Sequence, residues 1–153
     1  MSESFEQMGA ILQTHIDTDH EFLSWLGTTV EHVDYGEMTM AIPYDEKLTN
    51  TRPGRGDHRP DIHGGVAATL IDTVGGLVFH TDFDKPTESG AATINLNVNY
   101  LRPATGDLEA TATIVRAGQS VGVSEITVES TTPDGETTEV ATGQGSYRLF
   151  RVD

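Results

Sequence analysis

The chain of 153 residues contains no cysteine. This absence excludes disulfide bonds, thiolate metal sites and cysteine nucleophiles. A chain of this length can bury a hydrophobic core without disulfides or structural metals. We therefore expect one domain that spans residues 1–153.

Basic residues are scarce, with 9 Lys plus Arg against 24 Asp plus Glu and a formal net charge of -15 at pH 7. Such a charge repels both a nucleic-acid backbone and an anionic membrane, so we expect neither as a partner. The acids are scattered and form no block of five like charges. They favour a halophilic surface, where salt screens charge repulsion beyond about 3 Å at 1 M. The alternative is an ordinary acidic cytosolic protein.

Long apolar runs are also missing. No run approaches the roughly 18 apolar residues that a membrane-spanning helix needs. The first ten residues lack the basic region and apolar core of a signal peptide. We therefore expect a cytoplasmic protein.

The hydrophobic pattern predicts an α+β fold. Apolar residues at helical spacing predict a helical segment in residues 1–25, and residues 28–44 predict a hairpin that turns at 34–36. A helix of about four turns follows, with Val66, Leu70 and Val74 on its apolar face. Four β runs complete the chain, at residues 92–101, 108–117, 121–131 and 137–150. Together these elements predict a curved antiparallel sheet around one long helix.

The run at 92–101 alternates between apolar and polar residues. This period of two predicts Ile94, Leu96 and Val98 on one face of the strand and Thr93 with Asn95 on the other.

Asp72 is the only formally charged residue between Ile62 and His80. A helix that carries almost no charge is expected to be buried on all sides. At 100° per residue, Asp72 lies opposite the apolar face and beside small residues such as Ala68 and Gly76. This second face is predicted to meet a partner subunit or a cleft, where the carboxylate can act as a base or nucleophile. The alternative is a buried carboxylate satisfied by Thr69, Thr73 or a subunit contact.

Gly64 and Gly65 open the same helix. Backbone N–H groups of the first helical turn have no acceptor within the helix and favour an anion or a developing oxyanion. His63 is expected to orient this corner or to contact a substrate. The alternative for the two glycines is a tight turn into the helix.

The segment 45–61 contains four of the nine basic residues, which are Lys47, Arg52, Arg55 and Arg59. Such a cluster in an acidic chain indicates a site for an anionic, phosphate-bearing ligand. The alternative is a surface loop in which the arginines pair with Asp57 and Asp61.

Asp57, His58, Asp61 and His63 carry metal-binding groups at close spacing. Loop His and Asp residues are more often solvated than bound to metal, so we expect no metal site.

The segment from His63-Gly64-Gly65 to Asp72 closely resembles the hot-dog fold thioesterases of the phenylacetate-degradation (PaaI-like) type. The resemblance covers roughly residues 25–150, including the strand at 93–96 that leads into 100–104 and the corner at 115–120. It implies a hot-dog fold, in which about five or six antiparallel strands wrap a long central helix. It also implies an acyl-CoA thioesterase.

The resemblance further implies residue roles. Asp72 matches the acid that activates water as a general base or attacks the thioester directly. The Gly64 N–H matches the donor that polarises the thioester carbonyl, with His63 beside it, and Thr93 matches the hydroxyl that helps to place water. In such enzymes the site lies between two subunits, so we expect a homodimer or a homotetramer.

Relatives often carry an asparagine six residues before the histidine, where this chain has Asp57. Either Asp57 or Asn50 fills that position. The predicted substrate-binding residues are Asn50, Asp57, Gly65, Arg102 and Arg116. The candidates to hold CoA phosphates are Arg52, Arg55, Arg59, Arg102 and Arg116, and the alternative is that these arginines pair with surface acids.

The expected activity is hydrolysis of acyl-CoA or aryl-acyl-CoA to the free acid and CoA, without metal or organic cofactor. A hot-dog hydratase needs a histidine and an acid that face the same substrate carbons. His63 and Asp72 are about two and a half helical turns apart, which argues against it. The alternative from another class is a non-catalytic hot-dog protein that binds or senses acyl-CoA.

Overall fold

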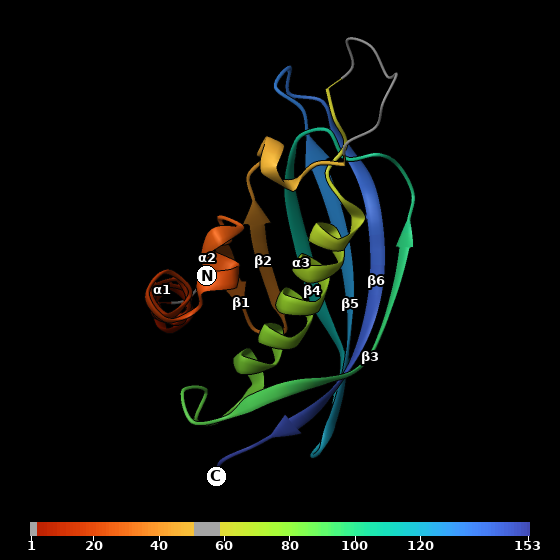
Figure 1. Ribbon diagram of the computed structural model, residues 1–153. Coiled ribbons are helices and arrows are strands. Elements are labelled where there is room, and N and C mark those ends of the chain that lie inside the picture. Colours follow the sequence, from red (N-terminus) through yellow and green to blue (C-terminus); the bar gives the residue numbers. More distant parts are fainter. Residues whose placement is uncertain (1–2, 51–58) are drawn as a thin grey trace.

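The computed structural model describes residues 3–50 and 59–153 (Figure 1). Its helices are α1 (Glu3–Asp19), α2 (Glu21–Trp25) and α3 (Gly64–Leu77), with two 3₁₀ helices, η1 (Glu46–Leu48) and η2 (Val78–Asp82). Its strands are β1 (Thr29–Asp34), β2 (Glu37–Ile42), β3 (Gly90–Tyr100), β4 (Asp107–Ala117), β5 (Val121–Thr131) and β6 (Thr137–Phe150).

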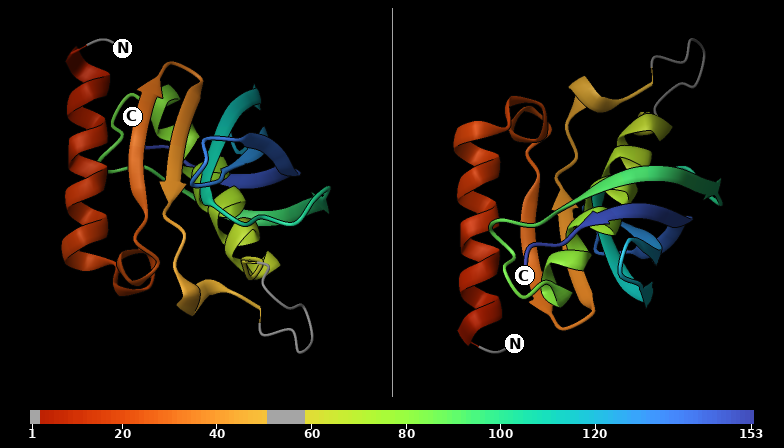
Figure 2. Two further views of the ribbon diagram at one scale, coloured as in Figure 1. Left: turned by 90° about the horizontal axis from the view of Figure 1, so that it is seen from above. Right: turned by 90° about the horizontal axis from the view of Figure 1, so that it is seen from below.

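The strands form one antiparallel sheet in the order β1-β2-β4-β5-β6-β3. The sheet curves around α3, which contacts β2, β3, β4, β5 and β6 (Figure 1). The expected α+β hot-dog architecture is thereby confirmed, with six strands. α1 lies outside this wrapped helix, alongside β1 (Figure 2).

Glycines let the sheet approach the helical elements closely. A Cβ atom at Gly143 would lie 2.7 Å from Ile71 Cγ2 on α3, and one at Gly122 would lie 2.3 Å from the Phe79 ring. Side chains at these positions would overlap with a close-packed core. α3 and η2 can therefore pack this close to the sheet only because positions 143 and 122 carry no side chain.

The predicted faces of β3 were wrong at the start of the strand. The register with β6 shifts between Thr93 and Asn95, as at a β-bulge, because Thr93 pairs with Tyr147 and Asn95 pairs with Ser146. The extra residue puts Thr93 on the same inner face as Leu96. Ile94 is 58% exposed and does not join that face.

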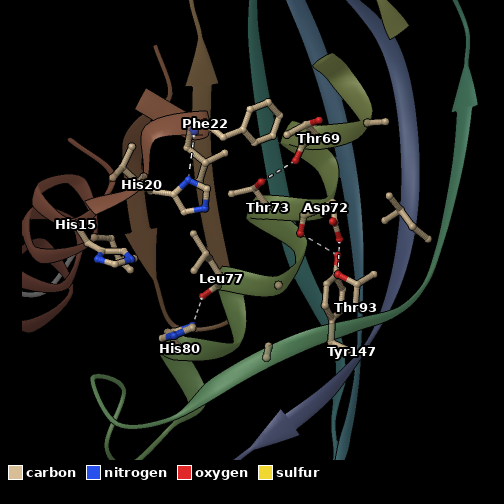
Figure 3. A pocket seen from close by; sticks show the side chains of 17 residues that line it. His15, His20, Phe22, Thr69, Asp72, Thr73, Leu77, His80, Thr93 and Tyr147 are labelled. Atoms are coloured by element: carbon tan, nitrogen blue, oxygen red, sulfur yellow. Dashed lines mark hydrogen bonds between the residues drawn. The ribbon is translucent and has the colours of Figure 1, made fainter. Parts of the chain in front are cut away.

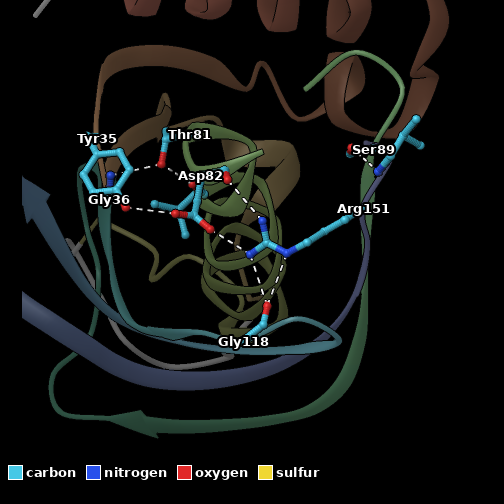
Figure 4. A network of polar contacts seen from close by, with 9 residues as sticks. Tyr35, Gly36, Thr81, Asp82, Ser89, Gly118 and Arg151 are labelled. Atoms are coloured by element: carbon cyan, nitrogen blue, oxygen red, sulfur yellow. Dashed lines mark hydrogen bonds and ion pairs between the residues drawn. The ribbon is translucent and has the colours of Figure 1, made fainter. Parts of the chain in front are cut away.

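A polar network around Arg151 joins one 3₁₀ helix and two turns (Figure 4). The Arg151 guanidinium donates to the Asp82 carboxylate at 2.7 Å, to the Asp82 carbonyl at 3.1 Å and to the Gly118 carbonyl. The Tyr35 hydroxyl donates to the other Asp82 oxygen at 2.9 Å. This network joins η2 to the β1–β2 and β4–β5 turns.

In the described ranges, 3–50 and 59–153, no helix is both long enough and apolar enough to span a membrane.

Candidate functional site

A cleft of about 600 Å³ lies between α3, β3 and the two N-terminal helices (Figure 3). The face of α3 that carries Asp72 lines this cleft. The helical projection had predicted that this face meets either a partner subunit or a cleft. α1 and α2 supply the opposite wall, and β3 supplies Thr93. Asp72 is partly exposed in this cleft.

Asp72 accepts a 2.6 Å hydrogen bond from the Thr93 hydroxyl to Oδ1. The bulge in β3 makes this contact possible because it turns Thr93 toward α3. The neighbouring hydroxyls of Thr69 and Thr73 donate instead to helix carbonyls, at Gly65 and Thr69. The alternative in which these two threonines satisfy Asp72 is therefore wrong.

Tyr147 forms a hydrogen bond to the backbone of Asp72. Its hydroxyl donates to the Asp72 carbonyl oxygen at 3.1 Å, and its side chain is 1% exposed. Burial, and then the charge of Asp72, raises the pKa of Tyr147 far above its usual range. The phenol therefore stays a protonated donor.

The N-terminus of α3 is held by two side chains. His63 is the N-cap, and its Nδ1 accepts the Gly65 N–H at 2.8 Å. The Tyr100 hydroxyl donates to the Gly64 carbonyl at 2.7 Å. Gly64 is the first helical residue, so its N–H has no acceptor within the helix. Of the two glycines, Gly64 is thus the candidate oxyanion donor, because the Gly65 N–H is already used by the cap.

A second hollow of about 340 Å³ lies beside Gly64, and Asn50 and Arg102 line it. Arg102 also donates to the Glu139 carbonyl at 2.8 Å. Arg116 lies near the opposite end of β4, beside the turn at Gly118. The structure therefore brings Asn50 and Arg102 to Gly64 but leaves Arg116 apart.

Asp57, Arg52 and Arg55 lie outside the described residues. Within the described part of segment 45–61, the Lys47 ammonium lies 4.4 Å from the centre of the Trp25 ring and donates to the Trp25 carbonyl. The Arg59 guanidinium carbon lies 3.5 Å from the centre of the Tyr44 ring. These two cations contact aromatic rings, which neither the anion-site hypothesis nor the acid-pairing alternative predicted.

Among the residues described, no group of three His, Asp or Glu side chains could hold a metal ion. His58, like Asp57, lies outside them.

Gly64 and Asp72 are eight residues apart on α3, which places them about 12 Å apart along the helix axis. The two groups also border different hollows. One chain therefore cannot present both to the same carbonyl group.

Sequence reasoning missed the contribution of three histidines to the cleft. His15 and His20 come from the N-terminal helices and His80 from η2. His20 Nδ1 caps α2 by accepting the Leu23 N–H. Burial lowers the pKa of His80, whose Nδ1 lies 3.2 Å from the Leu77 carbonyl oxygen. The only sequence signal was the eight-residue spacing of His80 from Asp72, which places His80 about two helical turns further along the chain.

Comparison with known proteins gives a consistent picture. The family model described as the thioesterase superfamily matches residues 60–136. A protein of Halobacterium salinarum, whose name describes an esterase only provisionally, is 53% identical over 97% of this chain and 96% of its own length. The medium/long-chain acyl-CoA thioesterase YigI of Escherichia coli is 35% identical over 77 residues, which are 42% of this chain and 50% of YigI.

Solved structures share the fold. A thioesterase family protein from Silicibacter pomeroyi has a TM-score of 0.77 at 22% identity, over 94% of this chain and 98% of its own. The thioesterase HI1161 from Haemophilus influenzae has a TM-score of 0.72 at 18% identity, over 99% of this chain and 93% of its own. At these identities the likeness establishes the architecture.

Proposed function

Because the chain belongs to the thioesterase superfamily, we propose that it hydrolyses acyl-CoA or aryl-acyl-CoA thioesters to the free acid and CoA. The similarity to the Escherichia coli acyl-CoA thioesterase supports a CoA thioester as substrate. The arrangement of His63-Gly64-Gly65 with Asp72 nine residues after the histidine supports the phenylacetate-degradation type within the superfamily.

The observation that carries this proposal is the Asp72 carboxylate in the cleft, bonded to Thr93 at 2.6 Å. The bond fixes one carboxylate oxygen and leaves the other available to a water molecule or a thioester carbon. A positioned carboxylate of this kind can act as a general base or as a nucleophile.

In the proposed reaction, Asp72 takes a proton from a water molecule whose oxygen adds to the thioester carbonyl carbon. Alternatively, the carboxylate adds to that carbon itself and forms a mixed anhydride, which water then hydrolyses. In both routes the carbon–sulfur bond breaks, and the CoA thiolate leaves and is protonated. A single turnover in ¹⁸O-labelled water tests for direct attack: if water hydrolyses the anhydride at the Asp72 carboxyl carbon, the first product carries an unlabelled Asp72 oxygen and Asp72 becomes labelled.

The Gly64 N–H, at the positive end of α3, is the proposed donor to the oxyanion. A thioester carbonyl is already reactive, so one base and one oxyanion donor are enough, and we propose no metal or organic cofactor. Asn50 and Arg102, which line the hollow beside Gly64, are the proposed contacts to the rest of the substrate.

We further propose that a second copy of the chain completes the site. An oxyanion donor must lie about 3 Å from the oxygen that it stabilises, whereas Gly64 and Asp72 of one chain are about 12 Å apart. β3 is at the sheet edge and carries Thr93, so its unpaired backbone groups can join a second copy next to the cleft. The proposed assembly is a homodimer or a homotetramer built from such dimers.

The activity is tested by measuring CoA release from a panel of acyl-CoA and aryl-acyl-CoA thioesters in high-KCl buffer. We expect Asp72→Asn to lower kcat about 10²- to 10⁴-fold, the usual contribution of a general base. The matched control Asp17→Asn, on the exposed side of α1, should leave kcat unchanged. A wild-type protein that binds these thioesters without releasing CoA would instead be the acyl-CoA-binding or sensing protein.

The shared site is tested by mixing two inactive variants. Gly64→Pro removes the donor N–H at the first helical position, where proline is tolerated. The preceding residue, His63, already has the extended ψ of 132° that a following proline requires. Gly64→Ala is its control, because it adds a Cβ atom but keeps the N–H. Mixed dimers of Gly64→Pro with Asp72→Asn contain one intact site if the two groups come from different subunits. Activity should then return on mixing, and its absence would place both groups in one chain.

A further inference from the structure

Two hollows meet beside the C-terminal end of α3. The first is the cleft that contains Asp72, and the second is an apolar groove of about 480 Å³ between α1 and the loop before β3. Phe5, Met8 and Pro86 are among the residues that line the groove. Leu12, His15 and His80 line both hollows, so these three side chains form the wall between them.

The cleft extends from Asp72 on α3 toward His80 on η2. Asp72, Gly76 and His80 follow one another at steps of four residues, and all three line the cleft. Asp72 and His80 are about 13.5 Å apart along the axis, from five α-helical and three 3₁₀ steps. Gly76 lies between them, and a Cβ atom there would be 3.1 Å from the Tyr147 ring.

The walls of this passage suit an unbranched hydrocarbon chain. Its lining includes five large aliphatic side chains, Leu12, Ile16, Leu23, Leu77 and Leu96, beside polar side chains such as His20 and Thr73. No lysine or arginine lines it among the residues described. Burial of apolar surface here would be the main contribution to binding such a chain.

His80 closes the passage as a neutral, fixed ring. Its Nδ1 contacts the Leu77 carbonyl at 3.2 Å, and its ring meets the Phe83 ring edge-on at 5.2 Å between centres. Burial lowers the pKa of His80, so the ring is uncharged at neutral pH and can contact an apolar group. The ring position in the cleft is visible in Figure 3.

We infer that the acyl tail of the substrate lies along α3 from Asp72 toward α1, and that the His80 ring determines the longest tail that fits. This inference rests on the proposed thioesterase function and goes beyond it, because it names an unbranched aliphatic acyl group and a residue that sets its length. Beyond His80, the groove along α1 is the space that a longer tail would enter.

The inference is tested with butanoyl-, octanoyl-, dodecanoyl- and hexadecanoyl-CoA. His80→Ala should raise the ratio of kcat/KM for hexadecanoyl-CoA to that for octanoyl-CoA at least about ten-fold, since each buried methylene contributes roughly four-fold. His80→Trp should lower the same ratio. His32→Ala is the matched control, because His32 lies on β1 and lines neither hollow.

Leu12→Ala opens the same wall from α1, so it should shift the ratio in the same direction and replaces His80→Ala if that variant does not fold. A uniform change in kcat/KM at every chain length, for both Leu12→Ala and His80→Ala, would overturn the inference while leaving thioester hydrolysis intact.

Binding measurements keep the inference testable if the wild type hydrolyses none of these thioesters. In that case the proposed function fails, and the affinities of Asp72→Asn and of the Asp72→Asn/His80→Ala double variant for the same thioesters are compared. The double variant should gain affinity for hexadecanoyl-CoA relative to octanoyl-CoA. An unchanged affinity ratio would exclude the tail from this passage.

Discussion

The Tyr100 hydroxyl donates a 2.7 Å hydrogen bond to the carbonyl oxygen of Gly64. The N–H of the same peptide unit, on Gly65, donates to His63 Nδ1 at 2.8 Å. Both ends of this peptide are therefore held by side chains, which fixes the orientation of the first turn of α3. The N–H of Gly64, in the preceding peptide unit, has no acceptor within the helix and can donate to a group outside the chain.

Tyr100→Phe should lower kcat about two- to ten-fold with little change in KM, because one hydrogen bond contributes roughly 0.5–1.5 kcal/mol. Steady-state kinetics with an acyl-CoA substrate would measure this change. Tyr35→Phe is the matched control, since it removes a tyrosine hydroxyl that bonds to Asp82 in the Arg151 network. Equal losses of kcat in the two variants would show a general effect on the fold.

Gly75→Ala should destabilise the protein, although alanine is the better helix former. The new Cβ atom would lie 2.4 Å from the Tyr147 hydroxyl and 3.0 Å from Ile126. Overpacking of this kind costs about 1–3 kcal/mol in the free energy of unfolding, which urea titration measures. Gly90→Ala, whose Cβ atom would meet nothing within 4 Å, should change it by less than about 0.5 kcal/mol.

Arg151→Ala should lower the free energy of unfolding by about 2–3 kcal/mol, since charge-assisted hydrogen bonds are the stronger ones. The lost contacts are to Asp82 at 2.7 Å and to Gly118, and the pair is largely buried. Asp19→Ala breaks the exposed pair between His15 and Asp19, which should cost less than about 1 kcal/mol. If both variants unfolded at the same urea concentration, the network would have no special role.

Periodicity alone was enough to predict α3 and the hairpin, and it gave the bounds of β5 and β6. It also placed Asp72 on the cleft face, because a helix fixes the direction of each side chain relative to its neighbours. The eight-residue separation of Gly64 from Asp72 on α3 follows from the same helix geometry. Local patterns that depend only on one element were therefore readable from the sequence.

The contact between Thr93 and Asp72 could not be derived from the alternation in β3. That alternation assigned Thr93 to the wrong face, because a bulge depends on the pairing partner β6 and leaves no period of its own. The roles of His15 and His20 depend on where α1 and α2 lie against α3. Such contacts between elements distant in sequence are a property of the tertiary fold.

His80 should make stability depend on pH. Burial lowers its folded pKa below the ordinary value of 6.5, so the unfolded chain binds this proton first as the pH falls. The stability that neutral His80 contributes is complete above pH 6.5 and is lost as the pH falls through its lowered folded pKa.

The free energy of unfolding of His80→Gln should therefore fall less steeply with pH below 6.5 than that of wild type. The difference in slope should reach at most about 1.4 kcal/mol per pH unit, the value for one proton. Urea titrations between pH 7.5 and 5.5 would measure it. His15 also lines this part of the cleft, so His15→Gln is measured in parallel. A slope that changes only in the His15 variant would contradict the assignment to His80.

Three glutamates form a row across the exposed face of the sheet. Glu109 on β4 is paired with Glu129 on β5, which is paired with Glu139 on β6, and all three are exposed. Like charges directly opposite one another destabilise a sheet. In a chain with a net charge of -15, this row is a local example of repulsion that high salt would relieve.

Glu129→Gln, at the centre of the row, should raise the free energy of unfolding by about 0.5 kcal/mol in 0.1 M KCl. The gain should largely disappear in 1 M KCl, because the screening length falls from about 10 Å to about 3 Å. In a Glu109→Gln/Glu139→Gln background the same substitution should give no gain at either salt concentration, which isolates the pairwise repulsion. A gain that persists in 1 M KCl or in that background would assign it to the glutamine side chain. The acidic surface would then need a source of salt dependence other than repulsion within this row.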